Sequence, residues 1–273
     1  KDLLCTFFVL VTVYTYALYA GRVKSSAGKT RGMTDSWYLA SVGSYLLALL
    51  CKPSAVTFPF ILLMLDWYPF ERWRTGSDTA RLLIEKIPFA VLSLAASAVT
   101  YFAHAVIGDI TALDHVDLVT RLLVSAKAAV FYIVHLLWPV GLLPFYPYPE
   151  KAHILMPSYL FSVTALVLIA AGCLFYWKKH KPVTMVSLYF FIMLIPVIGL
   201  VKMGFQEMAD RYAYLPSIGP IFLIAGGCSI VAKKIVSSNG AGMKFAGITL
   251  GVLVVLFLSL QTVKQTAIWK NDL

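Results

Sequence analysis

Long apolar runs recur along the sequence and constrain the fold more than any other feature. Each run has roughly 17 to 21 mostly apolar residues, about the length that a helix needs to cross the hydrocarbon core of a bilayer. The chain of 273 residues is 60% hydrophobic and only 13% charged, a composition outside the range of soluble domains. We therefore predict membrane-spanning helices over six stretches: residues 3–20, 87–107, 158–176, 183–201, 216–232 and 245–262.

Two further apolar regions are interrupted by proline. Residues 37–68 contain Lys52-Pro53, and residues 117–145 contain Pro139 and Pro144. Proline ends or kinks a helix because it lacks an N–H donor and clashes with the preceding turn. Each region is therefore one kinked span, a hairpin of short helices or a re-entrant segment. The predicted fold is an all-α, polytopic membrane helix bundle with about eight to ten transmembrane segments.

Basic residues are concentrated in three of the loops between these runs, at 21–36, 178–182 and 233–244. Short cytoplasmic loops are enriched in Lys and Arg, so we place these three loops inside and residues 202–214 outside. An even number of crossings must then separate the first two loops. The interrupted regions meet this condition if both are single spans or both are hairpins. The condition fails if only one of them is a hairpin.

Several classes of chemistry lack a matching motif. The net charge of +10 does not indicate nucleic acid, because the basic residues form no patch interleaved with aromatics. The four cysteines show no CxxC spacing, and the five histidines form no zinc or catalytic-triad motif. No protein metal ligands are predicted. Any chemistry at the membrane must use other residues.

The stretch GFQEMADRYAYLPS, residues 204–217, places charges between two apolar runs. Pro216 suits the first position of a helix, so Arg211 is expected just before a helix N-terminus, where free N–H groups favour an anion. The guanidinium of Arg211 is a planar donor fork suited to phosphate oxygens. We predict Arg211 as a phosphate-binding residue, supported by Glu207, Asp210, Tyr212 and Tyr214.

A second basic residue stands beside a predicted helix start in CKPSAVTFP, residues 51–59. Lys52 directly precedes Pro53 and is predicted as a second anion-binding residue. It reaches the outer face only if residues 37–68 form a hairpin, because in a single kinked span it would lie deep in the membrane. Simpler alternatives stand beside both predictions. In the first alternative, Asp210 and Arg211 only form an ion pair with each other. In the second, Lys52 extends its ammonium to the lipid headgroups.

Four segments resemble a known family: KDLLCTFF at the start, LLALLCKPSAVTFPFILLMLDWYPFERW at 46–73, FYPYP at 145–149 and IPVIGLVKMGFQEMADRYAYLPSIG at 195–219. They are similar to segments of the bacterial relatives of transmembrane O-mannosyltransferases that carry tetratricopeptide repeats, in the type C glycosyltransferase (GT-C) superfamily. The similarity extends over nearly the whole chain. It implies a GT-C-like enzyme of the bacterial inner membrane that transfers a sugar from a polyprenyl-phosphate carrier to a hydroxyl of a protein or glycan, outside the cytoplasm.

The resemblance also implies roles for particular residues. Lys52 and Arg211 would bind the donor phosphate, with Lys1 and Asp2 added to the supporting residues. The catalytic acidic pair of the family precedes Lys1, so we expect this chain to be the middle of a longer protein. Residues 1–262 are then a transmembrane domain, and residues 263–273 are a junction toward a tetratricopeptide-repeat region. Participation of a divalent metal ion stays open, and the expected partners are the lipid-linked sugar, its acceptor and membrane lipid.

Two other functions would use the same features. A flippase or transporter of lipid-linked sugars needs basic groups for the phosphate, but also a polar path across the bilayer, and the sequence shows no ladder of intramembrane charges. A scaffold subunit without catalysis would keep the spans and lack the acidic pair. An acidic pair upstream of Lys1 would favour the enzyme over the scaffold.

Overall fold

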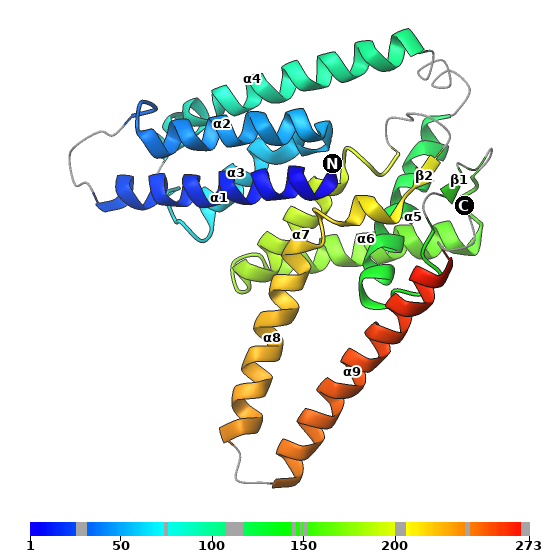
Figure 1. The fold of residues 1–273 in the computed structure, drawn as a ribbon. Helices are drawn as coiled ribbons and strands as arrows, with labels where there is room; N and C mark the ends of the chain where they lie inside the picture. The colour runs from blue at the N-terminus through cyan, green and yellow to red at the C-terminus, as the bar shows by residue number, and fades with distance from the viewer. Residues whose placement is uncertain are drawn as a thin grey trace.

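The computed structural model describes residues 1–25, 32–73, 76–107, 117–143, 146–147, 149, 152–199, 206–237 and 241–268. Over these residues the protein is a helix bundle with one short strand pair, and the predicted all-α class is confirmed (Figure 1). Its helices are α1 (Asp2–Ser25), α2 (Ser36–Cys51), α3 (Phe58–Trp67), α4 (Gly76–Ile107), α5 (Leu118–Leu137), α6 (Pro157–Tyr176), α7 (Lys181–Leu194), α8 (Ile218–Ser237) and α9 (Ala241–Ile268). Shorter elements are the 3-10 helices η1 (Pro53–Thr57) and η3 (Asp210–Ala213) and the strands β1 (Tyr146–Pro147) and β2 (Gln206–Met208).

Six of the helices are long and apolar enough to cross a membrane, namely α1, α4, α5, α6, α8 and α9. Together with the shorter apolar helices α2, α3 and α7, they make the chain an integral membrane protein by length and composition. Their large exposed apolar side chains, such as Leu94, Phe175 and Phe222, have lipid as their natural environment. The same surface on a soluble protein would be an aggregation hazard.

The first two helices form an antiparallel pair that defines the two ends of the bundle. At one end Asp2, at the start of α1, pairs with Lys52, which follows α2. At the other end Arg22 lies 3.9 Å from Asp35. Asp35 is the N-cap of α2, because its carboxylate accepts the Trp37 N–H at 2.9 Å. We call these the Lys52 end and the Asp66 end, the second after the buried carboxylate described below.

Residues 37–68 form a hairpin whose tip lies at the Lys52 end. Lys52 ends α2, and Pro53 begins η1, which leads into α3. Proline suits this position because the first N–H of a helix has no intrahelical partner. Helix α3 then returns along α1, so that Asp66 reaches Tyr16. The predicted condition for bringing Lys52 to a membrane face, a hairpin at residues 37–68, is met.

Aromatic side chains fill the core between α1, α2, α3 and α4. Tyr16, Tyr38, Tyr45, Phe58 and Phe89 are each no more than 1% exposed and pack in one cluster. Two tyrosine hydroxyls of this core bond to polar partners in α4, as buried hydroxyls favour: Tyr38 donates to the Glu85 carbonyl at 2.6 Å, and the Tyr45 hydroxyl lies 2.6 Å from that of Ser93. These bonds fix α4 against α2.

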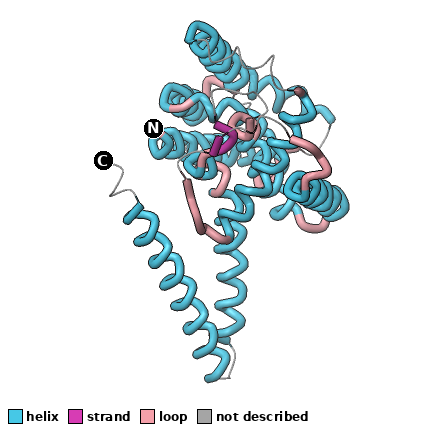
Figure 2. The backbone as a smooth tube through the Cα atoms, turned by 90° about the vertical axis from the view of Figure 1, so that its right-hand side faces the viewer, coloured by secondary structure: helices cyan, strands magenta, loops and turns pink. Residues whose placement is uncertain are grey.

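The remaining helices attach to this core at few places. Trp177, at the end of α6, stacks on Trp67, at the end of α3, with ring centroids 6.3 Å apart. Gly219 lies so close to Tyr189 of α7 that a side chain at 219 would meet the ring, which lets α8 begin against α7. Beyond this contact α8 extends away from the bundle (Figures 1 and 2), whereas α9 returns to the segment after α5, where Gln265 donates to the Leu142 carbonyl at 2.9 Å. The apolar windows of both helices are 0% buried.

The structure corrects several predicted boundaries. Residues 37–68 are a hairpin but the described part of the second region, residues 117–143, contains one helix, α5, so the expectation that both regions are of the same kind is wrong. Helix α7 ends at Leu194 because the chain turns there, whereas a span to residue 201 was predicted. Helix α9 continues through Ile268, into the predicted junction at 263–273, and residues 269–273 lie outside the described part.

Candidate functional site

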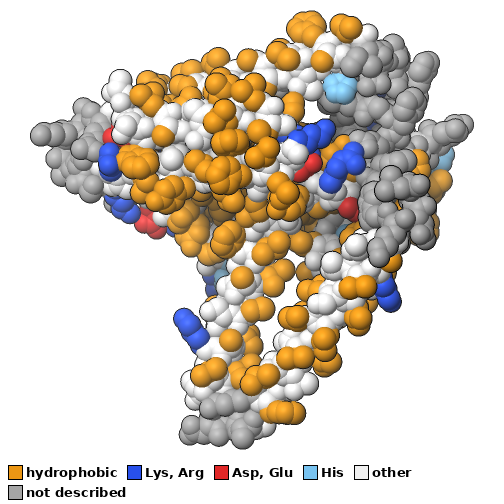
Figure 3. Space-filling model, viewed as in Figure 1, with side chains coloured by type: hydrophobic (Ala, Val, Ile, Leu, Met, Phe, Trp, Pro, Cys, Tyr) orange, Lys and Arg blue, Asp and Glu red, His pale blue; other side chains and the backbone are white. Residues whose placement is uncertain are grey.

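A pocket at the Lys52 end brings together residues from four parts of the chain. Helix α1, the junction of α2 with η1, the end of α7 and the segment that joins η3 to α8 all contribute. The lining residues are Asp2, Cys5, Thr6, Lys52, Ser54, Met193, Val197, Arg211, Tyr212, Tyr214, Leu215 and Pro216. Five of the eight residues predicted from the sequence are among them. On a largely apolar face, charged side chains gather near the start of α1 (Figure 3).

Lys52 stands at the centre of the charged contacts in this pocket. Its ammonium pairs with the carboxylate of Asp2 and lies 4.8 Å from the centre of the Tyr212 ring. The Lys52 side chain is 15% exposed and that of Asp2 is 25% exposed. The pair is therefore shielded from water more than a surface ion pair, and its electrostatic attraction is correspondingly stronger. The alternative in which Lys52 extends its ammonium to the headgroups stays a prediction.

Arg211 approaches the same aromatic ring. The central carbon of its guanidinium lies 5.2 Å from the centre of the Tyr212 ring. The face of an aromatic ring is negative, so it attracts both cations and holds them near each other without neutralising either. Tyr212 thereby links Lys52, from the first hairpin, to Arg211, from the segment before α8. The two predicted phosphate-binding residues share one pocket.

Asp210 faces a different part of the chain. Its carboxylate accepts the Leu143 N–H at 2.6 Å and contacts the Tyr146 hydroxyl at 3.4 Å. Burial raises the pKa of Asp210 above its ordinary value, and it likewise raises the pKa of Tyr146, with the Asp210 carboxylate contributing. The alternative of a local Asp210–Arg211 ion pair is therefore wrong. Asp210 instead fastens η3 to the loop after α5, which positions the adjacent Arg211.

The expected helix N-terminus beside Arg211 is not free. Helix α8 begins at Ile218 rather than Pro216. The intervening turn already uses donors of this region, because the Ser217 N–H bonds to the Ala213 carbonyl at 2.8 Å and the Ile218 N–H bonds to that of Leu215. Anion recognition here thus depends on the side chains of Lys52 and Arg211 more than on the helix dipole.

The other predicted residues lie at or near the pocket. Tyr214 lines it and is 48% exposed. Lys1 is exposed at the start of the chain, and its carbonyl accepts the first hydrogen bond of α1 from Cys5. Glu207 belongs to strand β2, which pairs with β1, and its side chain lies outside the described part. Sequence reasoning missed the apolar lining of Cys5, Met193 and Val197, which carry no signal beyond their place in apolar runs.

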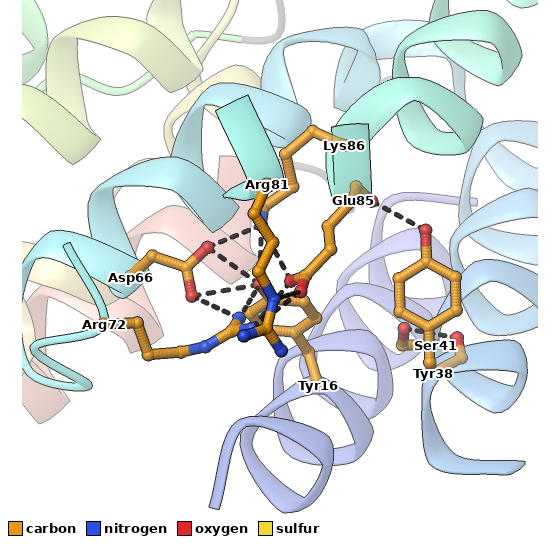
Figure 4. Close-up of polar contacts among 8 residues, drawn as sticks. All are labelled: Tyr16, Tyr38, Ser41, Asp66, Arg72, Arg81, Glu85 and Lys86. Atoms are coloured by element: carbon orange, nitrogen blue, oxygen red, sulfur yellow. Dashed lines mark hydrogen bonds and ion pairs between the residues drawn. The ribbon is translucent and has the colours of Figure 1, made fainter. Parts of the chain in front are cut away.

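A second polar cluster, which the sequence did not predict, lies at the Asp66 end (Figure 4). Asp66 is 0% exposed and accepts hydrogen bonds from Tyr16 at 2.8 Å, from Arg72 at 2.8 Å and from Lys86. Arg72 also donates to both carboxylate oxygens of Glu85, at 2.7 and 2.9 Å. Two carboxylates thus balance the two buried cations, Arg72 and Lys86, and hydrogen bonds satisfy their polar atoms, as buried charges require.

This cluster joins α1, α3 and α4 rather than forming a path to the pocket. Between it and the pocket, α1 contributes Val9 and α2 contributes Ala48 and Leu49, all buried in the aromatic and aliphatic core. The DWYPFERW segment, residues 66–73, supplies two members of the cluster, Asp66 and Arg72. Its charge spacing and its position directly after an apolar run were the available signals.

Metal ligation has no support in the described part of the chain. No group of three or more His, Cys, Asp or Glu side chains there is arranged to hold an ion. At the pocket, Asp2 already has Lys52 as its partner, and the second cation, Arg211, lies nearby. This donor set suits an anion, because its cations would repel a metal ion.

The fold and the pocket define an integral membrane protein with a cationic, aromatic site at one end of its helices. No protein-family model, curated protein or solved structure matches the chain.

Proposed function

We propose that the protein is a membrane glycosyltransferase of the GT-C type, which transfers a sugar from a polyprenyl-phosphate carrier to a hydroxyl acceptor. The observation that carries this proposal is the approach of Lys52 and Arg211 to the same ring, that of Tyr212, in one pocket at the end of an apolar bundle. The ligand that fits these features has an anionic head and a long apolar tail. A lipid phosphate has both.

The pocket residues suit the departure of a lipid phosphate. When the acceptor hydroxyl attacks the anomeric carbon, the bond to the carrier breaks and negative charge grows on the phosphate oxygen. Lys52 and Arg211 would stabilise that charge, and the Arg211 fork would hold two phosphate oxygens at once. The general base would be supplied by the acidic pair expected before Lys1. In this scheme the described pocket binds and orients the donor.

The charge distribution supports an extracytoplasmic pocket. Arg22 near the end of α1, and Lys178 and Lys179 after α6, lie at the Asp66 end, since α6 ends against Trp67 there. Basic loops face the cytoplasm as a rule. The pocket, at the opposite end, would then face outward in the bacterial inner membrane, where a carrier-linked sugar and a hydroxyl acceptor meet.

Two measurements on the full-length protein test this proposal. Native mass spectrometry should detect bound polyprenyl phosphate and much weaker binding of the matching polyprenol, which lacks the phosphate. Incubation with a polyprenyl-phosphate sugar should then release polyprenyl phosphate in an amount that depends on a hydroxyl acceptor. Equal binding of the phosphate and the polyprenol would refute the phosphate site. Phosphate binding without acceptor-dependent release would leave a binding protein and refute the transferase.

Transport of a lipid-linked sugar is the second candidate, and the buried charges of Asp66, Glu85 and Lys86 favour it. Charged side chains inside membrane helices often mark transport paths. Here they are mutually paired and separated from the pocket by apolar core, which argues against a transport path from the pocket through these charges. In proteoliposomes, a transporter would move a labelled lipid phosphate between leaflets, whereas a transferase would require the acceptor.

A further inference from the structure

The path of the chain around α5 carries an inference about the membrane that does not depend on the proposed function. Helix α4 passes the Asp66 end near its start, where Glu85 joins the buried charge cluster. The Tyr45–Ser93 contact then shows α4 running beside α2 toward the Lys52 end. Since α4 continues to Ile107, the chain leaves it at the Lys52 end.

The position of α6 shows at which end of the bundle the chain lies after α5. It ends at the Asp66 end, where Trp177 stacks on Trp67. A helix that crosses to that end must begin at the Lys52 end, so Pro157 lies there. The chain therefore leaves α4 and enters α6 at the same end. Helix α5, which lies between them, cannot cross the membrane once without breaking this parity.

Contacts made by the C-terminal half of α5 agree with this path. The Tyr132 hydroxyl donates to the Ala209 carbonyl at 3.1 Å, and the loop after α5 bonds to Asp210 through the Leu143 N–H. Both partners directly precede the pocket residue Arg211. The N-terminal half packs near the start of α6, where Leu123 and Tyr159 share a cluster. In Figure 1, α5 lies steeply across α6.

The side chains of α5 divide into two faces that suit a membrane surface. One face is exposed and apolar, with Leu118, Val119, Leu122, Val134 and Leu137 each at least 46% exposed. The opposite side packs on the protein, with Leu123, Val124 and Ala128 buried there. With α5 at the interface, its exposed apolar stripe would lie in the acyl boundary.

Lys127 gives a separate argument. It occupies the middle of the 20-residue helix α5, so a membrane-crossing α5 would carry it to the bilayer centre, where charged side chains are disfavoured. Its ammonium lies 5.6 Å from the centre of the Tyr159 ring, near the start of α6. An aromatic ring beside a lysine at that level is typical of the interface.

We propose that α5 lies along the membrane surface at the Lys52 end, inserted by its apolar stripe at the boundary of headgroups and acyl chains, and does not cross. The even number of crossings required between the loops at 21–36 and 178–182 is then met by α2, η1 with α3, α4 and α6. One hairpin and one surface helix thus replace the two matched regions predicted from the sequence.

Single cysteines at both ends of α5 test this arrangement in intact cells. The background is the full-length protein with its cysteines replaced by alanine, and reactivity of each site is first established in detergent. Lys1→Cys reports the Lys52 end and Met33→Cys, between α1 and α2, reports the Asp66 end. Asp117→Cys and Val140→Cys flank α5, and both positions are exposed.

A membrane-impermeant thiol reagent should divide these four sites into two groups. We expect Asp117→Cys and Val140→Cys to follow Lys1→Cys, and Met33→Cys to show the opposite reaction before permeabilisation. If Val140→Cys follows Met33→Cys while Asp117→Cys does not, α5 crosses the membrane and the proposal is overturned. If both flanking sites follow Met33→Cys, the path through α4 is wrong and the proposal fails as well.

Discussion

The ammonium of Lys52 lies 4.8 Å from the centre of the Tyr212 ring and also pairs with Asp2. These three residues come from the end of α2, from η3 and from the start of α1. Lys52 therefore has a carboxylate that neutralises it and a ring that attracts it without neutralising it. An incoming anion would compete with the carboxylate for Lys52 and leave the ring contact in place.

Replacing Lys52 should weaken anion binding. Lys52→Met keeps much of the aliphatic volume and removes the charge, so we expect affinity for polyprenyl phosphate to fall by about tenfold to a hundredfold, the usual effect of losing a charge-assisted contact. Native mass spectrometry across a lipid titration measures this. Lys179→Met, at the other end of the protein, is the matched control and should bind normally. Unchanged binding by Lys52→Met would remove Lys52 from the site.

Replacing Asp2 should have the opposite effect. Asp2→Asn frees Lys52 from its counter-ion while keeping the size of the side chain, so polyprenyl phosphate should bind several-fold more tightly. The gain should disappear when Asp2→Asn is combined with Lys52→Met, because Asp2 acts through Lys52. Weaker binding by the single Asp2→Asn variant would show instead that Asp2 is needed to hold Lys52 in position.

Arg211 permits a graded test. Arg211→Lys keeps the charge but loses the two-pronged geometry, so its affinity for the lipid phosphate should fall between those of the wild type and Arg211→Ala. The Ala variant should lose about tenfold to a hundredfold. Tyr212→Phe keeps the ring that both cations approach and serves as the mild control. Equal losses for Arg211→Lys and Arg211→Ala would support a bidentate role, whereas no loss in either would exclude Arg211 from binding.

Asp210 gives a test based on pH. Burial raises the pKa of Asp210 above the ordinary value of 3.8, so the folded protein favours the protonated acid more than the unfolded chain does. Relative to Asp210→Asn, the wild type should be most stable below that value and should lose stability as the pH rises through the folded pKa. Apparent melting temperatures of both proteins in detergent, from pH 3.5 to 8 at one scan rate, measure the difference. A relative loss for the wild type as the pH falls would contradict a raised pKa.

The sequence predicted the class of fold and much of the pocket because both depend on local signals. Apolar run length indicates which helices are long enough to cross, and Arg211, Tyr212 and Tyr214 lie together because they are neighbours in sequence. Lys52 was identifiable because a cation next to proline interrupts an apolar run. Whether it met Arg211 depended on residues 37–68 forming a hairpin, and run length alone does not distinguish a hairpin from a kinked span.

Other features depend on contacts between distant residues. Asp66 and Glu85 stand in separate runs, and the packing of α4 beside the end of α3 brings them to the same arginine, Arg72. The interpretation of Pro216 as a helix start was wrong because the preceding turn uses the nearby N–H groups for its own hydrogen bonds. For α5, the sequence left a kinked span, a hairpin and a re-entrant segment open, whereas the path of its neighbours favours the surface helix proposed above.

The buried charges at the Asp66 end should be needed for stability as a balanced set. Asp66→Asn leaves Arg72 and Lys86 with one carboxylate in a buried site, which typically destabilises a protein by about 3 to 5 kcal/mol. Arg81→Gln is the matched control, because its half-exposed contact with Glu85 at 3.3 Å is a pair usually worth about 1 kcal/mol or less. Thermal unfolding in detergent compares the two variants. Combining Asp66→Asn with Lys86→Met restores the balance of charge, so the double variant should be more stable than Asp66→Asn alone. If the two losses simply add, the cluster stabilises the bundle by packing rather than by charge balance.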